Sequence, residues 1–265
     1  MKKILSIVLI LSCFLSFGQK DTIVEYLDQT KTNFVAKDKA QYTRLIIRKN
    51  PNVQVLFYDL NGQLVSDELF SDIKLSKEIG IHNFFHKNGQ LRLIKTYNDK
   101  SQYHGNFSSF FIDGGKSVTG IYRDNKREGV WNFHYPNGNR IARLVYSKGE
   151  VKKYNLWYEN GEVKNEKLIF EKRPSFKGGK KSLSNYVRRK LTPKFRKSKF
   201  KGRLILRFAI NKEGRPVDIK IHPESLTEKE INNILRFFKE MPNWEPGIQL
   251  NRKVKVRYTL PIKLN

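Results

Sequence analysis

Cysteine, proline and acidic side chains are all scarce in this chain of 265 residues. There is a single cysteine, Cys13, and there are 9 prolines. Because Cys13 lies in a segment that we expect to be removed on export, the mature chain would have neither disulfides nor a thiol nucleophile. Acidic residues number 25 against 52 lysines and arginines, which gives a net charge of +27. A charge of this size attracts anions without specifying which kind.

Long hydrophobic runs are absent except near the N-terminus. Two lysines precede an apolar run over residues 4–17, and small residues stand three and one before a cut after Gly18. This layout is typical of a signal peptide over residues 1–18. The run is shorter than the roughly 20 residues of a spanning helix, so we favour cleavage, with an inner-membrane anchor at residues 4–17 as the alternative. Lipid attachment at Cys13 is disfavoured because Leu11 fits such a site poorly. We therefore expect a protein of the periplasm or cell envelope.

The positive charge is concentrated towards the C-terminus. Residues 172–265 carry 26 basic against 7 acidic side chains, or +19, whereas residues 1–171 carry +8. Export would separate the chain from cytoplasmic nucleic acid, so no nucleic-acid partner is expected. An anionic lipid or lipopolysaccharide surface, or an acidic envelope protein, is the partner that the charge favours.

Turn signals recur along the first two thirds of the chain. Successive glycines of these signals are 27, 25, 24 and 23 residues apart, and each signal follows an aromatic run. The pairs are Asn61-Gly62, Asn88-Gly89, Asp113-Gly114, Asn137-Gly138 and Asn160-Gly161. Such pairs supply the positive φ angles of hairpin turns. We predict an antiparallel β array over residues 19–171, made of hairpin units that bury their faces against one another, with residues 20–52 beginning the same sheet.

The repeat unit is most regular in "REGVWNFHYPNGNRIARLVYSKG", residues 127–149. It resembles MORN-type repeats in their looser bacterial form, and the resemblance extends over about residues 53–170. It implies an elongated antiparallel sheet and no particular activity. Some units depart from the pattern, since residues 153–155 lack the glycine that Gly105 and Gly129 supply before their strands.

The aromatic and histidine side chains of the array are possible binding groups. We expect Phe85, Phe111, Tyr135 and Tyr158 to stack between hairpins as the core of the sheet, with an exposed ligand-binding face as the alternative. His82 and His86 share one face of a strand about 13 Å apart, too far to bind one metal ion directly. We interpret both histidines as surface residues.

The C-terminal part begins where Pro174 and the Gly178-Gly179 pair interrupt the array. The pattern of residues 172–265 predicts a domain with the order helix, strand, strand, helix, strand. The first helix has an apolar stripe of Leu183, Tyr186, Val187 and Leu191, and the second has Ile231, Ile234, Leu235 and Phe238. Thr227 and Glu230 form a capping box before the second stripe.

Several motifs of this domain occur in a characteristic order: "FKGGKKSLSNYVRRKL", "KGRLILRFAINKEGRPVDIKI", "MPNWEPG" and "KVKVRYTLPIKLN". They resemble the C-terminal domain of the TonB family over about residues 173–265. The resemblance implies a two-helix, three-strand α+β domain that binds a peptide of an outer-membrane transporter. The proline-rich spacer and second membrane segment of an energy transducer are missing, which puts energy transduction in doubt. We interpret Trp244 as a structural plug between helices and sheet.

The last strand, residues 252–263, is the predicted binding element. Chain order places the first strand of the domain in the centre of its sheet, so the last strand is an edge that can accept a peptide strand. The predicted partner-binding residues are Lys253, Val254, Lys255, Val256, Arg257 and Tyr258. The three cations would point outward and select acidic residues, or would only guard the edge against aggregation.

No catalytic motif is recognisable in the sequence. It has no Gly-x-Ser-x-Gly, no phosphate-binding Walker sequence and no metal-spaced His/Cys set. We therefore expect a binding protein of the envelope without a cofactor, and not an enzyme. The alternatives are a membrane-anchored energy transducer and a protein that binds anionic lipid or lipopolysaccharide.

Overall fold

The computed structural model describes residues 22–264 apart from 197 and 224. The expected signal peptide therefore lies outside the described residues. The chain divides into two compact units between Val163 and Lys164, a few residues before the boundary expected at 171/172. Within the described part, neither helix has the length and apolar character needed to cross a membrane.

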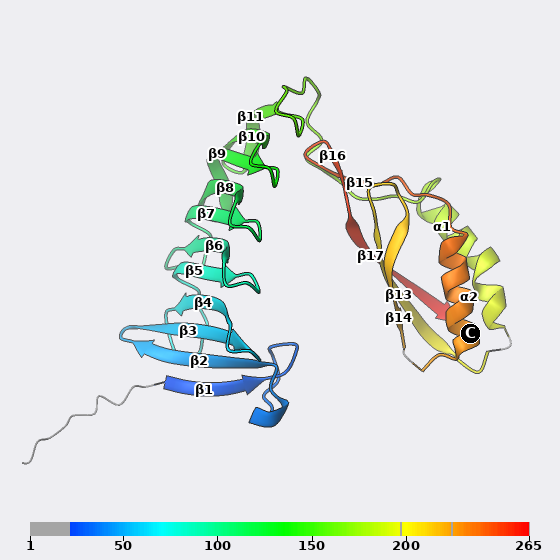
Figure 1. Ribbon diagram of the computed structural model, residues 1–265, viewed down its shortest axis with the longest axis horizontal. Helices are drawn as coiled ribbons and strands as arrows, with labels where there is room; N and C mark the ends of the chain where they lie inside the picture. Colours follow the sequence, from blue (N-terminus) through cyan, green and yellow to red (C-terminus); the bar gives the residue numbers. More distant parts are fainter. Residues whose placement is uncertain (1–21, 197, 224, 265) are drawn as a thin grey trace, which may run out of the picture. The chain divides into compact units, whose positions relative to one another are not determined.

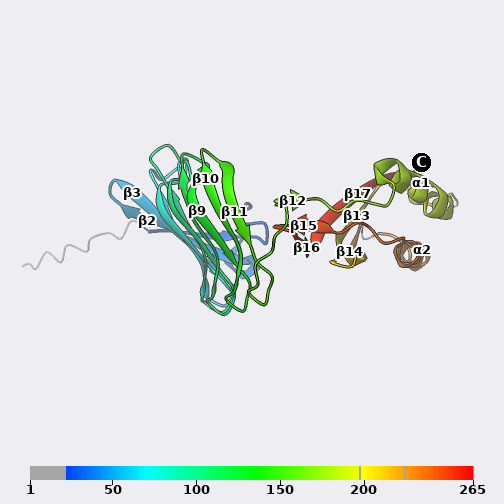
Figure 2. The same ribbon diagram turned by 90° about the horizontal axis from the view of Figure 1, so that it is seen from above.

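The first unit is one antiparallel sheet in which each strand lies beside its neighbours in sequence (Figures 1 and 2). Among the described residues it has eleven strands, in the order β1 to β11. They are β1 (Thr22–Leu27), β2 (Tyr42–Lys49), β3 (Asn52–Asp59), β4 (Leu64–Phe70), β5 (Gly80–Phe85), β6 (Leu91–Tyr97), β7 (Gly105–Phe110), β8 (Lys116–Arg123), β9 (Lys126–His134), β10 (Arg140–Ser147) and β11 (Glu150–Leu156). The predicted antiparallel array is confirmed, and the same sheet begins before the repeats as expected, with β1 and β2.

In each recurring turn, the glycine adopts a positive φ angle and the residue before it does not. In the first, the Gly62 N–H donates to Asp59 O at 3.0 Å and the Asp59 N–H donates to Gln63 O at 3.0 Å. Gly62 has φ of 74°, whereas Asn61 is not in the positive region. The same bonds recur in the four later turns. This is a type I turn followed by a glycine bulge, so the asparagine is not required to adopt positive φ.

The core of the array is a row of aromatic rings on one face. Trp131 is fully buried, and its ring lies 4.9 Å from that of Tyr122 and 5.4 Å from that of Phe107. The prediction that Phe85, Phe111, Tyr135 and Tyr158 form the core is only partly correct: Tyr135 is buried, Phe85 and Phe111 are half-buried, and Tyr158 is 44% exposed. The reason is that Tyr158 lies in the final turn, where no further hairpin follows to cover it.

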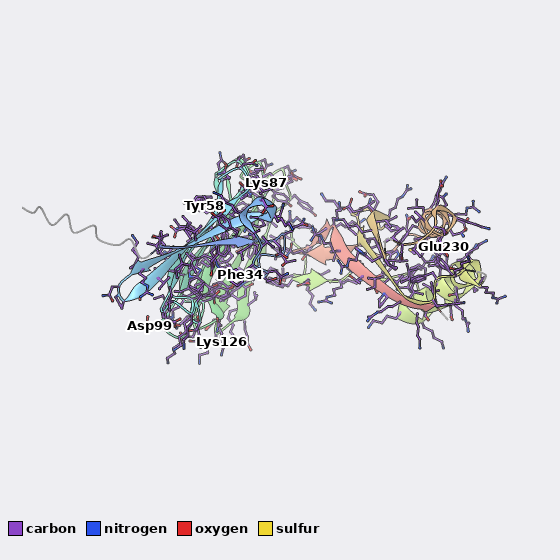
Figure 3. All side chains as sticks on the ribbon, turned by 90° about the horizontal axis from the view of Figure 1, so that it is seen from below. Phe34, Tyr58, Lys87, Asp99, Lys126 and Glu230 are labelled. Atoms are coloured by element: carbon purple, nitrogen blue, oxygen red, sulfur yellow. The ribbon has the colours of Figure 1, made fainter. Side chains whose placement is uncertain are left out.

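Not every large apolar side chain of this unit is covered. Phe34, labelled in Figure 3, follows β1 and is 67% exposed. It forms a bridge with Leu27 beside the first strand.

The second unit contains two short three-stranded sheets and, in its described residues, two α-helices. The larger sheet has the order β14-β13-β17, with the first of these strands in sequence at its centre as predicted. Its elements are α1 (Gly179–Lys190), β13 (Gly202–Ile210), β14 (Pro216–His222), α2 (Glu228–Lys239) and β17 (Val256–Leu264). A short 3-10 helix, Thr192–Phe195, follows α1, and another, Lys37–Lys39, lies in the first unit.

Both helices cover the same face of this sheet (Figure 1). The even-numbered side chains of β13, such as Leu206 and Phe208, pack in one buried cluster with Val187 of α1 and Ile234 of α2. Trp244 is 4% exposed in this cluster, and its ring lies 4.8 Å from that of Tyr258. The predicted structural role of Trp244 is therefore confirmed.

One residue of the second helical stripe was assigned to the wrong face. Leu235 is 44% exposed, whereas the adjacent Phe237 is 3% exposed and packs on Tyr186 with ring centroids 5.1 Å apart. Two consecutive phenylalanines, Phe237 and Phe238, fill the inner face instead. The larger rings bury more apolar area than a leucine would, which decides the rotation of the helix about its axis.

The smaller sheet, which was not predicted, has the order β12-β15-β16. Its strands are β12 (Glu171–Lys172), β15 (Gly247–Gln249) and β16 (Arg252–Val254). Asn251, in the turn between the last two strands, accepts a hydrogen bond from Ile169 N–H at 2.6 Å and donates to Lys167 O at 2.8 Å. Residues 167–169, close to the start of the second unit, are thus held against the turn between β15 and β16.

Candidate partner-binding edge

β17 pairs with β13 along its whole length, from Val256↔Ile210 to Leu264↔Gly202. Pro261, opposite Ile205, has no N–H and so cannot form a hydrogen-bonded pair there. A second observation agrees with this. The Asn211 N–H donates to Arg215 O at 2.9 Å, so the odd-numbered backbone groups of β13 point towards β14 and the even-numbered ones towards β17. Antiparallel pairs alternate between bonded and non-bonded positions. The N–H and C=O groups of Arg257 and Thr259 therefore point away from β13.

These outward groups form a free edge. Among the described residues, no backbone or side-chain group bonds to the N–H of Arg257 or Thr259. Such an edge is a template for an added strand. The backbone of β17 thus offers two donors and two acceptors at these adjacent outward positions.

The predicted last strand is interrupted. Lys253 and Val254 belong to β16 and pair with β15, whereas Val256, Arg257 and Tyr258 belong to β17, and Lys255 lies between the two strands. The prediction of one strand over residues 252–263 is therefore wrong at this point. The reason is that residues 252–254 form β16 and pair with β15 in a hairpin of their own. The predicted alternation holds, since Lys253, Lys255 and Arg257 are exposed and Val254, Val256 and Tyr258 are half-buried.

A groove of about 680 Å³ runs beside the free edge of β17. One side is formed by Val256, Arg257, Tyr258 and Thr259, and the other by residues 173–176 and the first turns of α1. Its floor is apolar, with Trp244 and Leu183 both buried. A second hollow of about 540 Å³ continues it past Lys255 and Val254 to Ile248. Five of the six predicted residues line these two cavities, and Lys253 does not.

The wall opposite the edge is held by a network at Glu245. The Ser175 N–H donates to Glu245 O at 3.0 Å and the Glu245 N–H donates to Ser175 O at 2.8 Å. Lys172 Nζ lies 3.0 Å from Glu245 Oε2, and Ser175 Oγ donates to the same oxygen at 3.1 Å. The Lys172 hydrogen bond and, second, that of Ser175 lower the pKa of the Glu245 carboxyl. This wall was not predicted from the sequence, because the single bridge between Ser175 and Glu245 leaves no alternating pattern.

The three predicted cations are not equivalent. Lys255 Nζ lies 2.5 Å from Asp218 Oδ2, so an acid of the same domain already compensates its charge. Arg257 and Lys253 have no ion-pair partner among the described residues. Arg173 and Lys180 add positive charge along the groove, against the single acid Glu171.

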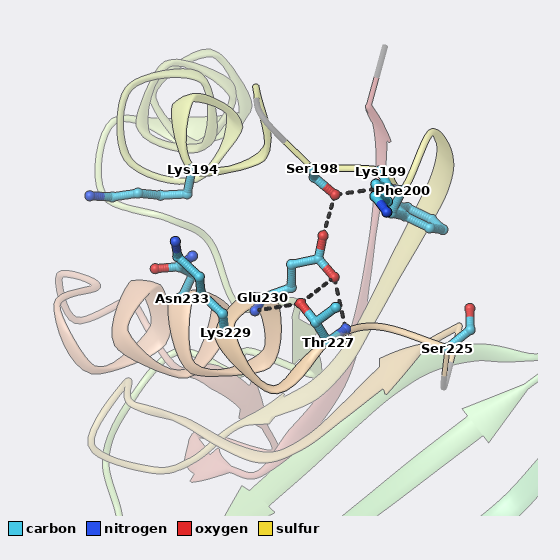
Figure 4. A pocket seen from close by; sticks show the side chains of 9 residues that line it. All are labelled: Lys194, Ser198, Lys199, Phe200, Ser225, Thr227, Lys229, Glu230 and Asn233. Atoms are coloured by element: carbon cyan, nitrogen blue, oxygen red, sulfur yellow. Dashed lines mark hydrogen bonds between the residues drawn. The ribbon is translucent and has the colours of Figure 1, made fainter.

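A separate cavity of about 510 Å³ lies at the start of α2 (Figure 4). Glu230 accepts hydrogen bonds from Thr227 N–H and Thr227 Oγ1, both at 2.8 Å, and from the Ser198 hydroxyl. The Ser198 bond, followed by those of Thr227, lowers the pKa of Glu230. The predicted capping box is confirmed, and it also ties the loop before β13 to the helix. The oxygens of this carboxylate are thus engaged in holding the structure.

The histidines were assigned incorrectly in one case. His82 is not a surface residue: it is fully buried, and its ring lies 4.7 Å from that of Tyr97. Its Nε2 lies 2.8 Å from Leu69 O, because the aromatic row on this face of the array encloses it. His86 is partly exposed, with Nε2 3.0 Å from Phe110 O. In the described part of the chain, no three His, Cys, Asp or Glu side chains are grouped to hold a metal ion.

Comparison with known proteins adds one finding on the array. Residues 78–99, which include β5 and β6, match the family of the MORN repeat variant. The MORN-like character of the repeats is therefore supported at this unit. No curated protein matches the chain.

Proposed function

We propose that this chain is an exported periplasmic or envelope protein that binds a partner by β-strand addition at β17, with the MORN-like array as a scaffold. The observation that carries the proposal is that the unpaired backbone groups of Arg257 and Thr259 face a groove with an apolar floor. An added strand gains affinity from main-chain hydrogen bonds and selectivity from alternate side chains. Here one set of side chains would enter the groove beside Trp244, and the other would lie near Arg257.

The partner that we propose is a peptide segment of an outer-membrane transporter or of another envelope protein. This follows from the resemblance of residues 173–265 to the TonB C-terminal domain. The strand order, with β13 in the centre, agrees with what the resemblance implies. The uncompensated cations Lys253 and Arg257 favour acidic residues in the peptide, and Lys255 contributes less because Asp218 neutralises it.

A second candidate is a membrane-anchored energy transducer, which the apolar run of residues 4–17 favours. N-terminal sequencing of the protein from cells separates the two candidates. A mature chain that begins at Gln19 excludes the anchored form. A chain that retains residues 4–17 excludes the periplasmic form.

The docking mechanism is tested with the full exported chain as bait in envelope extracts. Thr259→Pro removes one outward N–H, and Pro261 in the same strand indicates that the edge tolerates proline at such positions. Thr259→Ala keeps the N–H and is the matched control. We expect the proteins retained by the parent and by Thr259→Ala to be lost from Thr259→Pro.

The fold of each variant is checked by its circular dichroism and its melting temperature. If Thr259→Pro remains folded and retains the same proteins as the parent, the edge of β17 is not the docking site. The proposed mechanism is then wrong.

A further inference from the structure

The face of the β14-β13-β17 sheet that carries no helix is strongly basic. The even-numbered side chains of β13 and β17 pack under α1 and α2, so the odd-numbered ones point to the opposite face. The exposed cations on this opposite face are Arg203, Arg207, Lys220, Arg257 and Lys263. They occupy an area of about 20 Å by 10 Å, from the strand rise and spacing.

Two pairs of these cations stand directly opposite each other across adjacent strands. Arg203 pairs with Lys263, and Arg207 pairs with Lys220. Like charges in such positions destabilise a sheet. Among the described residues, none of the four has an acidic partner; the nearby Asp218 is engaged by Lys255. The arrangement thus costs stability in the free protein, and an external anion would relieve it.

The side chains around these cations restrict the kind of anion. Ile205, Ala209, Thr259 and Pro261 share the face, and no phenylalanine, tyrosine or tryptophan does. Single-stranded nucleic acid is bound largely by stacking on aromatic side chains, and among the described residues the only aromatic ring that the pairing places on this face is the imidazole of His222, opposite Ile205. A broad sheet face with several unpaired cations suits a layer of phosphate groups that can rearrange laterally.

We infer that the helix-free face of this sheet docks on an anionic lipid surface, through Arg203, Arg207, Lys220 and Lys263. Each basic residue near such a surface strengthens binding, and the attraction acts within about one Debye length. The interaction is distinct from strand addition, since it uses side chains of the sheet face and not the backbone of its edge. Lipid docking and peptide binding can therefore fail independently.

The experiment measures co-sedimentation of the exported chain with vesicles of equal parts phosphatidylglycerol and phosphatidylcholine. The test variant is Arg203→Gln, Arg207→Gln, Lys220→Gln. The control removes the same charges from the opposite side, in α1, as Lys181→Gln, Arg188→Gln, Arg189→Gln. Vesicles of phosphatidylcholine alone and an added double-stranded DNA competitor complete the set.

We expect the test variant to bind the anionic vesicles at least about tenfold more weakly than the parent, and more weakly than the control variant. Binding should fall as salt rises. The test variant should be at least as stable as the parent, because like-charge pairs are removed.

Three results would overturn the inference: equal losses in both variants, equal binding to neutral vesicles, or no binding to anionic vesicles. Displacement of the parent from vesicles by DNA, with the test variant losing affinity for DNA and vesicles equally, would reassign the face to polyanions in general.

Discussion

At the scale of single residues, the fold depends on a few close contacts that the sequence does not mark. Gly120 in β8 lies directly against Trp131: a Cβ added to it would lie 2.1 Å from the indole ring. Trp131 cannot easily move, because it is fully buried and its Nε1 donates to Ile121 O at 3.1 Å. The sequence showed Gly120 only as an isolated glycine in a strand, and the ring that it accommodates is on the next strand.

The first prediction concerns this contact. Alanine normally stabilises a strand relative to glycine, so a loss of stability on Gly120→Ala would report the steric clash. We expect the first unit to lose about 1–3 kcal/mol of unfolding free energy. Urea unfolding followed by tryptophan fluorescence measures this, with Thr119→Ala as the control in the same strand. Unchanged or increased stability would mean that Trp131 moves aside.

The second prediction concerns Glu230 at the start of α2. Its pKa is lowered in the folded state by Ser198 and Thr227, so the ionised carboxylate stabilises the fold. This contribution is fully present above the unfolded pKa of about 4.3 and is lost as the pH falls through the lower folded value. At pH 7, Glu230→Gln should therefore unfold at a lower urea concentration than the parent. The difference between the two urea midpoints should be smaller at pH 3.

Circular dichroism at 222 nm follows this transition, because both described α-helices lie in the second unit. Thr227→Ala removes the capping hydroxyl and should cost about 1 kcal/mol. A difference between parent and Glu230→Gln that is the same at pH 7 and pH 3 would contradict the role of the ionised carboxylate.

At the scale of elements, sequence patterns predicted strands and helices where one face of each is buried. Recurring turn signals predicted the array, Thr227 and Glu230 predicted the capping box, and chain order predicted the central position of β13. The short sheet β12-β15-β16 does not, because strands of two or three residues show no periodicity. Its formation depends on Asn251 and Glu245, whose partners are distant in sequence. For the same reason, the groove beside β17 could not be predicted, although five of the residues that line it and the adjoining hollow were.

The third prediction tests how Asn251 fastens the entering chain. Asn251 has φ of 56° and its side chain bonds to Ile169, Lys167 and Glu166. Asn251→Gly keeps this backbone conformation accessible and removes the three bonds. We expect faster proteolytic cleavage within residues 164–170. Asn251→Asp keeps the oxygen that accepts from Ile169 and should be cleaved at an intermediate rate. Equal rates for all three proteins would show that the side chain does not restrain this segment.

At the scale of the whole molecule, the chain joins two units with different surfaces. The first unit is a repeat array whose sheet continues from one hairpin to the next. The second unit carries most of the net charge. We propose that the array acts as a scaffold and that the second unit binds the partner. In this proposal, a partner strand forms hydrogen bonds with the outward backbone groups of Arg257 and Thr259.

Residue-resolved amide hydrogen exchange, with and without the partner recovered in the extract experiment, tests this claim most directly. In the free protein, Arg257 and Thr259 should exchange faster than their inward-bonded neighbours Tyr258 and Leu260. On binding, the account predicts that protection of Arg257 and Thr259 rises at least about tenfold, since each gains a hydrogen bond. Bound protein in which these two amides remain as fast as in the free chain would contradict strand addition at β17.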